Sequence, residues 1–275
     1  MDDKQRSLKH NVLLVWMTWS NEDKRKTFII AVLLSLVCSL MVATSAVLLK
    51  PKQQANKKQE IQENILTVAD IPFSKRSVSF EFSENIEVKL VDIQKGNFID
   101  HPDPQSYDWR GAMNDPINSV KLVEANDVAK IKRRPNILPV YLVKDKNQLK
   151  RLILPVYGYG LWSTLYGLLA LEADLQTVGG ISFYEHAETP GLGGEVDNPK
   201  WRESWKGKKV YDESGNVKLE AIRGYVKAGH PMQDYQVDGL SGASLTTQGV
   251  SNLIQFWMGE NGYGPFLKYV EGLQQ

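Results

Sequence analysis

The stretch that decides the fold class is ILPVYLVKDKNQLKRLILPV, residues 137–156. Two runs rich in Val, Leu and Ile flank a polar turn at residues 144–147, and this pattern predicts a β-hairpin. Further along the chain, residues 178–185 (VGGISFYE) predict another strand. Before the hairpin, residues 77–90 (SVSFEFSENIEVKL) alternate in part between apolar and polar side chains, which predicts strands with a turn near Glu84 and Asn85.

Two other segments place apolar side chains at helical spacing. In residues 161–173 (LWSTLYGLLALEA) the stripe consists of Leu161, Leu165, Leu168 and Leu169. In residues 248–258 it consists of Val250, Leu253, Ile254 and Trp257. Strands mixed with helices, without a regular βαβ repeat, predict an α+β domain. Residues 99–136 are rich in loops and proline, and no element is predicted there.

Residues 27–49 form an apolar run of 23 residues without a charge. At about 1.5 Å per residue such a helix crosses a bilayer core. Lys24, Arg25 and Lys26 precede the run, so the positive-inside rule predicts a cytoplasmic N-terminus and an exported C-terminal part. A cleaved signal peptide is the alternative, since small residues occur at 44–46. The charged segment before the run is longer than signal peptides have, and so is the run itself, which favours a retained anchor.

These features divide the 275 residues into four parts. We expect a cytoplasmic tail at 1–26, a transmembrane helix at 27–49, a polar stalk or short surface helix at 50–68, and an exported domain at 69–275. A second apolar stretch, residues 12–19 (VLLVWMTW), is too short to span a bilayer. Its tryptophans suit the membrane interface, although an ordinary amphipathic tail fits equally well.

Composition excludes several classes of function. The net charge is +1, from 33 basic and 32 acidic residues, which gives no electrostatic footprint for nucleic acid. One cysteine, Cys38, cannot build a disulfide framework or an iron–sulfur site, and the four histidines form no local metal motif. Any redox chemistry must therefore come from an organic cofactor.

Residues 238–247 (DGLSGASLTT) form a turn of small residues directly before the stripe at 248–258. Ser241, Ser244, Thr246 and Thr247 offer hydroxyl groups, and the N-terminus of the following helix suits an anionic phosphate. Taken as a bare Ser-Gly-Ala-Ser, the segment reads as a helix N-cap with a tight turn.

The longer pattern resembles the signature read by flavin transferases, enzymes that move FMN from FAD onto a Thr or Ser hydroxyl. The resemblance implies that Ser244 carries FMN through a phosphoester bond. The family usually has Thr at this position, but serine retains the reacting oxygen. By the same resemblance the motif residues beside the phosphate are Asp238, Ser241, Gly242, Ala243, Leu245 and Thr246.

Three further stretches occur in the order of one family: residues 160–166 (GLWSTLY), residues 188–196 (ETPGLGGEV), and Trp201 with residues 205–208 (WKGK). Together with the anchor they resemble NqrC, the singly anchored FMN carrier of the sodium-translocating NADH:quinone reductase. Alone, the first stretch reads as a turn with a packed tryptophan, and the second as a surface loop. The family's architecture implies a single inner-membrane helix and a periplasmic FMN domain. Its implied contacts to the isoalloxazine ring are Leu161, Trp162, Ser163, Glu188, Thr189, Leu192 and Gly193.

The resemblance implies an electron carrier within a membrane complex that oxidises NADH, reduces ubiquinone and exports Na⁺. The expected partners are the other subunits of that complex, a flavin transferase during maturation, and membrane lipid. We expect no catalytic residue, metal site or nucleic-acid partner in this chain alone. One alternative is the homologous anchored FMN carrier of the Rnf ferredoxin:NAD⁺ oxidoreductase, and another is a non-redox binding domain on a membrane anchor.

Overall fold

The computed structural model describes residues 24–146 and 148–274. The chain divides into two units, with the boundary between Lys57 and Lys58. Helix α2 (Lys24–Ala69) begins in the first unit and ends in the second. Its apolar part is long and apolar enough to cross a membrane, and none of it is buried within the chain. The predicted interfacial segment at 12–19 lies outside the described residues.

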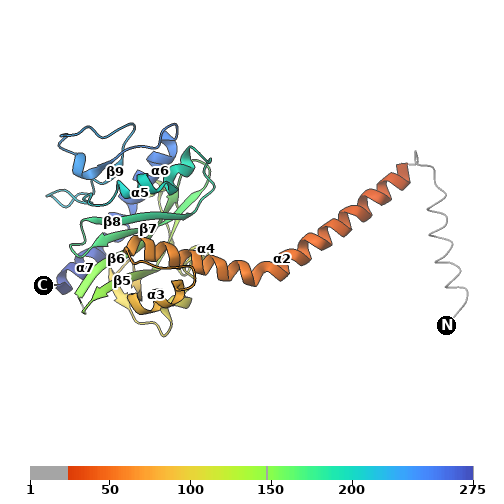
Figure 1. The fold of residues 1–275 in the computed structure, drawn as a ribbon, viewed down its shortest axis with the longest axis horizontal. Coiled ribbons are helices and arrows are strands. Elements are labelled where there is room, and N and C mark those ends of the chain that lie inside the picture. Colours follow the sequence, from red (N-terminus) through yellow and green to blue (C-terminus); the bar gives the residue numbers. More distant parts are fainter. Residues whose placement is uncertain (1–23, 147, 275) are drawn as a thin grey trace, which may run out of the picture. The chain divides into compact units, whose positions relative to one another are not determined.

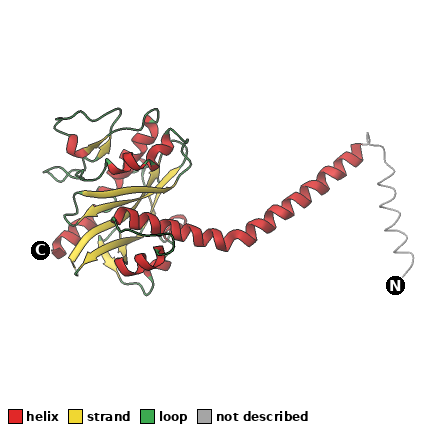
Figure 2. Ribbon diagram, in the orientation of Figure 1, coloured by secondary structure: helices red, strands yellow, loops and turns green. Residues whose placement is uncertain are grey.

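The second unit is built on one antiparallel sheet of six strands (Figure 2). The strand order across the sheet is β2-β1-β5-β6-β7-β8. These strands are β1 (Ile86–Asp92), β2 (Asn97–Ile99), β5 (Ile137–Asp145), β6 (Gln148–Tyr159), β7 (Thr164–Glu172) and β8 (Val178–Glu185). Two short pairs accompany the sheet: β3 (Ser119–Lys121) with β4 (Arg133–Pro135), and β9 (Glu220–Ala221) with β10 (Gln236–Val237).

The remaining elements connect and cover these strands (Figure 1). The further α-helices are α3 (Val78–Asn85), α4 (Trp109–Asn114), α5 (Pro199–Glu203), α6 (Ser244–Met258) and α7 (Gly264–Gln274). The 3-10 turns are η1 (Pro104–Ser106), η2 (Glu124–Asn126), η3 (Gly193–Asp197) and η4 (Gln233–Tyr235).

Apolar clusters cover both faces of the sheet, because side chains along a strand point alternately to its two sides. On β6, Leu152 and Leu154 join the cluster that includes Trp257 of α6. Ile153, between them, joins the cluster that includes Leu66 at the end of α2. The mixed architecture confirms the predicted α+β class.

Several predicted elements are confirmed. The hairpin is β5 and β6, whose register pairs Tyr141 with Ile153. The predicted strand at 178–185 is β8 with the same bounds. The stripe at 248–258 is the greater part of α6, which starts at Ser244. Helix α7, which follows it, was not predicted.

The helix predicted at 161–173 is wrong, because most of this segment is strand β7. Leu169 and Leu171 face one cluster, whereas Leu168 and Ala170 face the other. A strand buried on both faces has no polar side to alternate with its apolar side, so its sequence is a continuous apolar run. Four leucines in that run happen to match helical spacing.

The prediction of strands throughout residues 77–90 is wrong in its first half. Residues 78–85 form helix α3, and strand β1 begins only at Ile86. Val78 and Phe82 are one helical turn apart, and both are buried in the cluster beside α2. Partial alternation in so short a segment did not distinguish this pattern from a strand.

The compact domain begins before residue 69, where the sequence placed its boundary. It starts at Lys58, and Ile65, Leu66 and Val68 of the predicted stalk are buried in its core. The end of α2 is held by Arg151, which donates to the carbonyl of Val68 (3.3 Å). Residues 58–68 are therefore both helix and core.

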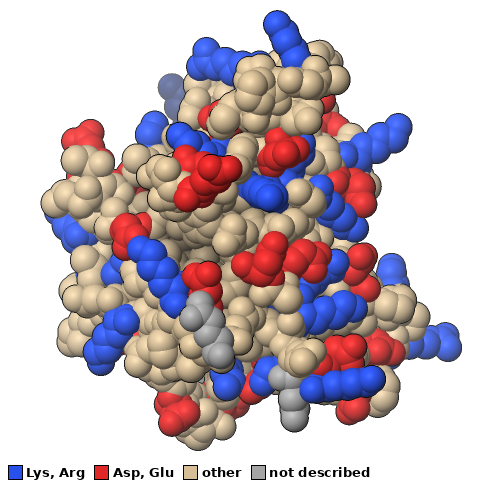
Figure 3. All heavy atoms as spheres, turned by 90° about the vertical axis from the view of Figure 1, so that its left-hand side faces the viewer, with Lys and Arg blue, Asp and Glu red and all other residues tan. Residues whose placement is uncertain are grey.

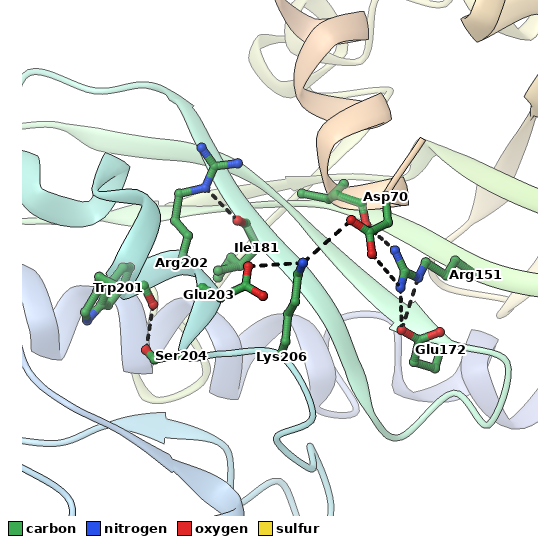
Figure 4. Close-up of polar contacts among 10 residues, drawn as sticks. Asp70, Arg151, Glu172, Ile181, Trp201, Arg202, Glu203, Ser204 and Lys206 are labelled. Atoms are coloured by element: carbon green, nitrogen blue, oxygen red, sulfur yellow. Dashed lines mark hydrogen bonds and ion pairs between the residues drawn. The ribbon is translucent and has the colours of Figure 1, made fainter. Parts of the chain in front are cut away.

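Charged side chains complete this junction, as Figure 4 shows. Arg151 pairs with Glu172 (2.8 Å) and with Asp70 (3.6 Å), which directly follows α2. Lys206 reaches the other oxygen of Asp70 (3.7 Å) and also pairs with Glu203 (3.1 Å). Elsewhere charge is mixed: Figure 3 shows basic and acidic side chains interspersed over one face, in keeping with the net charge of +1.

Candidate functional site

The motif at 238–247 forms a loop after β10 and the first turn of α6, which lies beside β9 (Figure 1). Ser244 is the first residue of α6, and it is exposed. The N-cap residue, Ala243, supplies no side-chain cap. The amide groups of the first turn are therefore available to a ligand at this helix end.

Buried and half-buried groups hold this loop in place. The carboxylate of Asp238 accepts a hydrogen bond from the Val226 amide (2.7 Å), and Thr247 Oγ1 accepts one from the Leu240 amide (3.0 Å). Gly242 has φ +72°, a left-handed conformation that favours glycine. Asp238, expected beside the phosphate, thus has its side chain engaged in shaping the loop.

A hollow of about 330 Å³ lies beside Ser244. The motif contributes Ser241, Gly242, Ser244 and Thr247 to its lining. The loop after β9 contributes Arg223, Gly224 and Tyr225, which the sequence did not single out. Parallel pairing of β9 with β10 brings the two loops together. Arg223 places a cation at the hollow, so a phosphate finds hydroxyl groups and a guanidinium there.

Glu188 joins three of the predicted stretches through one buried carboxylate. Its Oε1 accepts hydrogen bonds from the amides of Leu161 (3.1 Å), Trp162 (2.9 Å) and Ser163 (3.2 Å). Its Oε2 accepts one from Thr246 Oγ1 (2.6 Å). Glu188 is only 5% exposed and Thr246 is fully buried. The predicted flavin contacts Glu188 and Thr246 therefore direct their polar atoms to each other, beneath the surface of the site.

The Glu188 carboxyl has a pKa below its ordinary value of 4.5. Burial acts to raise this pKa, but the hydrogen bonds from Thr246 and from three backbone amides outweigh it. Glu188 is therefore ionised at neutral pH.

This lowered pKa predicts how stability depends on pH. The folded state binds the Glu188 proton more weakly than the unfolded state, so ionised Glu188 stabilises the fold above about pH 4.5. That contribution is lost as pH falls through the folded-state pKa. We expect Glu188→Gln to lower the melting temperature at pH 7, with a difference from wild type that shrinks below pH 4.5. A difference that stays constant with pH would contradict ionisation of Glu188.

Two glycines allow this close approach. A Cβ at Gly160 would lie 2.6 Å from Glu188 Oε1. A Cβ at Gly193 would lie 2.6 Å from Thr246 Oγ1 and 2.8 Å from Glu188 Oε2. Any larger residue at either position would push the carboxylate out of place.

Apolar side chains form a rim above the buried carboxylate. Trp162 is 65% exposed and Leu245 is 56% exposed, and Leu161 and Leu192 are also exposed. Leu192 lies against the acceptor loop, since a Cβ at Gly242 would be 2.9 Å from its Cδ2. Exposed large apolar side chains that surround a hollow suit a flat, largely apolar ligand.

The remaining predicted residues fall into two groups. Thr189 and Ser241 are exposed near the rim and the hollow, whereas Ala243 and Gly193 are buried. Ser163 is half-buried, and its hydroxyl accepts a hydrogen bond from the Ala187 amide (2.7 Å). The tertiary structure thus brings the predicted stretches into one place and separates a surface of contact from its buried support.

Comparisons with known proteins agree with this geometry. The FMN-binding domain family matches residues 160–259. The chain is 47% identical over 251 residues to the NqrC protein of the Na(+)-translocating NADH-quinone reductase of Pseudomonas aeruginosa, covering 90% of this chain and 96% of that protein. It is 45% identical over 255 residues to the corresponding protein of Yersinia pestis, covering 91% and 94%. The crystal structure of Shewanella oneidensis NqrC superposes with a TM-score of 0.74 at 34% identity, over 79% of this chain and 99% of that one.

Proposed function

The chain belongs to the NqrC family of the Na⁺-translocating NADH-quinone reductase, and we propose that it holds FMN by a phosphoester bond to Ser244. It is an FMN-binding flavoprotein and one component of a multi-subunit oxidoreductase that couples electron transport to sodium transport. The family match favours this assignment over the anchored FMN carrier of the Rnf complex.

One observation carries the attachment proposal: the exposed hydroxyl of Ser244 stands at the N-terminus of α6, at the edge of the hollow. A phosphate on this oxygen meets the positive end of a helix of 15 residues and the guanidinium of Arg223. Both favour the single negative charge of a phosphodiester. The site therefore fits the tethered group in charge as well as in space.

The chain's own residues bind and orient the cofactor. When bound, FMN supplies the ability to accept and donate electrons. A tether through phosphate leaves the ring unmodified, so its environment must set its properties. The rim residues Leu161, Trp162, Leu192 and Leu245 pack against the ring and exclude water, while Ser244 fixes its position along α6.

Maturation requires a flavin transferase, because no group in the hollow brings a phosphoryl donor of its own. Ser244 is exposed on a folded helix, so the transferase reaches it without unfolding the domain. We propose that loading follows folding.

We further propose that the helix at 27–49 is surrounded by lipid of the bacterial inner membrane, with the N-terminus cytoplasmic and the domain periplasmic. The basic residues Lys24, Arg25 and Lys26 before the apolar run support this orientation. Protease added to intact spheroplasts is expected to digest the domain that starts at Lys58. Inside-out vesicles should protect it, and the reverse pattern would overturn the orientation.

The attachment is tested by coexpressing the full chain with a flavin transferase and viewing the denatured protein on a gel under ultraviolet light. We expect a fluorescent band, and a peptide containing Ser244 that is heavier by FMN minus one water. A dark band of unmodified mass, with a threonine-type relative labelled in parallel, would overturn the phosphoester. The chain would then bind FMN without a covalent bond.

A further inference from the structure

We propose that Glu188 acts on the flavin through its charge: it is a positioning residue whose buried carboxylate lowers the reduction potential of bound FMN. This inference rests on the proposed function, since it concerns the flavin held at Ser244. It differs from the expectation that Glu188 contacts the ring directly.

The first step is the position of the carboxylate relative to the site. Its donors are the residues that frame the site: Leu161 and Trp162 give it their amides while their side chains form the rim. Its fourth donor, Thr246, is two residues from Ser244 on α6. The carboxylate therefore lies one layer behind the surface that faces the flavin.

The second step is that this charge is bound but not neutralised. All four donors are neutral groups. Among the ion pairs of residues 24–146 and 148–274, none includes Glu188. His186, two residues earlier, directs its Nε2 to Asp197 (2.8 Å). Hydrogen bonds from neutral dipoles stabilise a carboxylate without cancelling its unit charge.

The third step is the consequence for electron transfer. In a buried, low-dielectric position a charge acts more strongly on its surroundings than an exposed charge does. Adding electrons to the ring adds negative charge beside Glu188, so the carboxylate opposes reduction. Removing its charge while retaining its shape should make FMN easier to reduce.

Glu188→Gln is the test, because the glutamine oxygen can accept from the three amides while its NH₂ group donates to Thr246 Oγ1. The matched control is Glu203→Gln, which removes a carboxylate whose side chain is 67% exposed. Each full-length variant is coexpressed with the transferase, and covalent loading is measured first. The midpoint potential of the FMN is then determined by spectroelectrochemical titration.

We expect Glu188→Gln to favour one-electron reduction by on the order of tenfold, a rise of about 59 mV in potential. Glu203→Gln should leave the potential unchanged. A Glu188→Gln protein that loads fully with an unchanged potential would overturn the inference and leave Glu188 a purely structural role. Wild-type protein without covalent FMN would instead contradict the proposed attachment.

Wild-type protein answers the same question if Glu188→Gln does not load. Redox-difference infrared spectra of protein labelled with ¹³C-glutamate report whether a carboxylate responds to flavin reduction. A labelled carboxylate band that shifts on reduction supports the coupling. Labelled bands that are identical in the oxidised and reduced states would contradict it.

Discussion

Replacing Ser244 with alanine is expected to abolish covalent flavin completely while leaving the fold intact. The change removes the only atom that forms the proposed phosphoester bond. Ser244 is exposed and is not the N-cap of α6, so its loss should change the free energy of unfolding by no more than about 0.5 kcal/mol. In-gel flavin fluorescence measures the loading, and the melting temperature measures the fold.

Two variants act as controls for this prediction. Ser244→Thr keeps the hydroxyl group and restores the residue usual in the family, so it should load fully. Ser214→Ala removes another exposed serine hydroxyl, from a loop outside the motif, and should also load fully. Fluorescence that persists in Ser244→Ala would show that FMN is attached to a different hydroxyl.

Gly249→Ala in α6 is expected to destabilise the domain by about 1–3 kcal/mol through overpacking. In an open helix the same substitution stabilises, because alanine is the better helix former by about 1 kcal/mol. Here the added Cβ would lie 2.5 Å from the carbonyl oxygen of Tyr159 and 2.9 Å from the Cα of Gly160. Both are backbone atoms that cannot rotate away, so α6 must move from the loop that Glu188 holds.

Gly272→Ala in α7 is the matched control, since a Cβ there would meet nothing within 4 Å. It should stabilise the domain by about 0.5–1 kcal/mol, the opposite sign. Urea denaturation of the two variants measures both effects. Because the displaced loop frames the site, Gly249→Ala should also reduce flavin loading. Equal effects of the two substitutions would show that α6 does not pack closely on Gly160.

The sequence by itself determined the features that depend on neighbours along the chain. The hairpin at 137–156, the bounds of β8 and the apolar helix at 27–49 each follow from a local pattern. The motif around Ser244 is likewise contiguous, as are the stretches at 160–166 and 188–196. Their order was enough to indicate the family, which the comparisons confirm.

Only the tertiary structure decided what each part packs against. Residues 164–172 form a strand because both faces of the sheet are covered, and no local pattern records that. Arg223 meets the acceptor loop because β9 pairs with β10, across 15 positions of sequence between Ala221 and Gln236. Glu188 lies in a segment that reads as a surface loop, yet it is buried because donors from two distant segments converge on it. Periodicity and motif spacing record local conformation, whereas burial and electrostatics depend on segments that meet only when the chain folds.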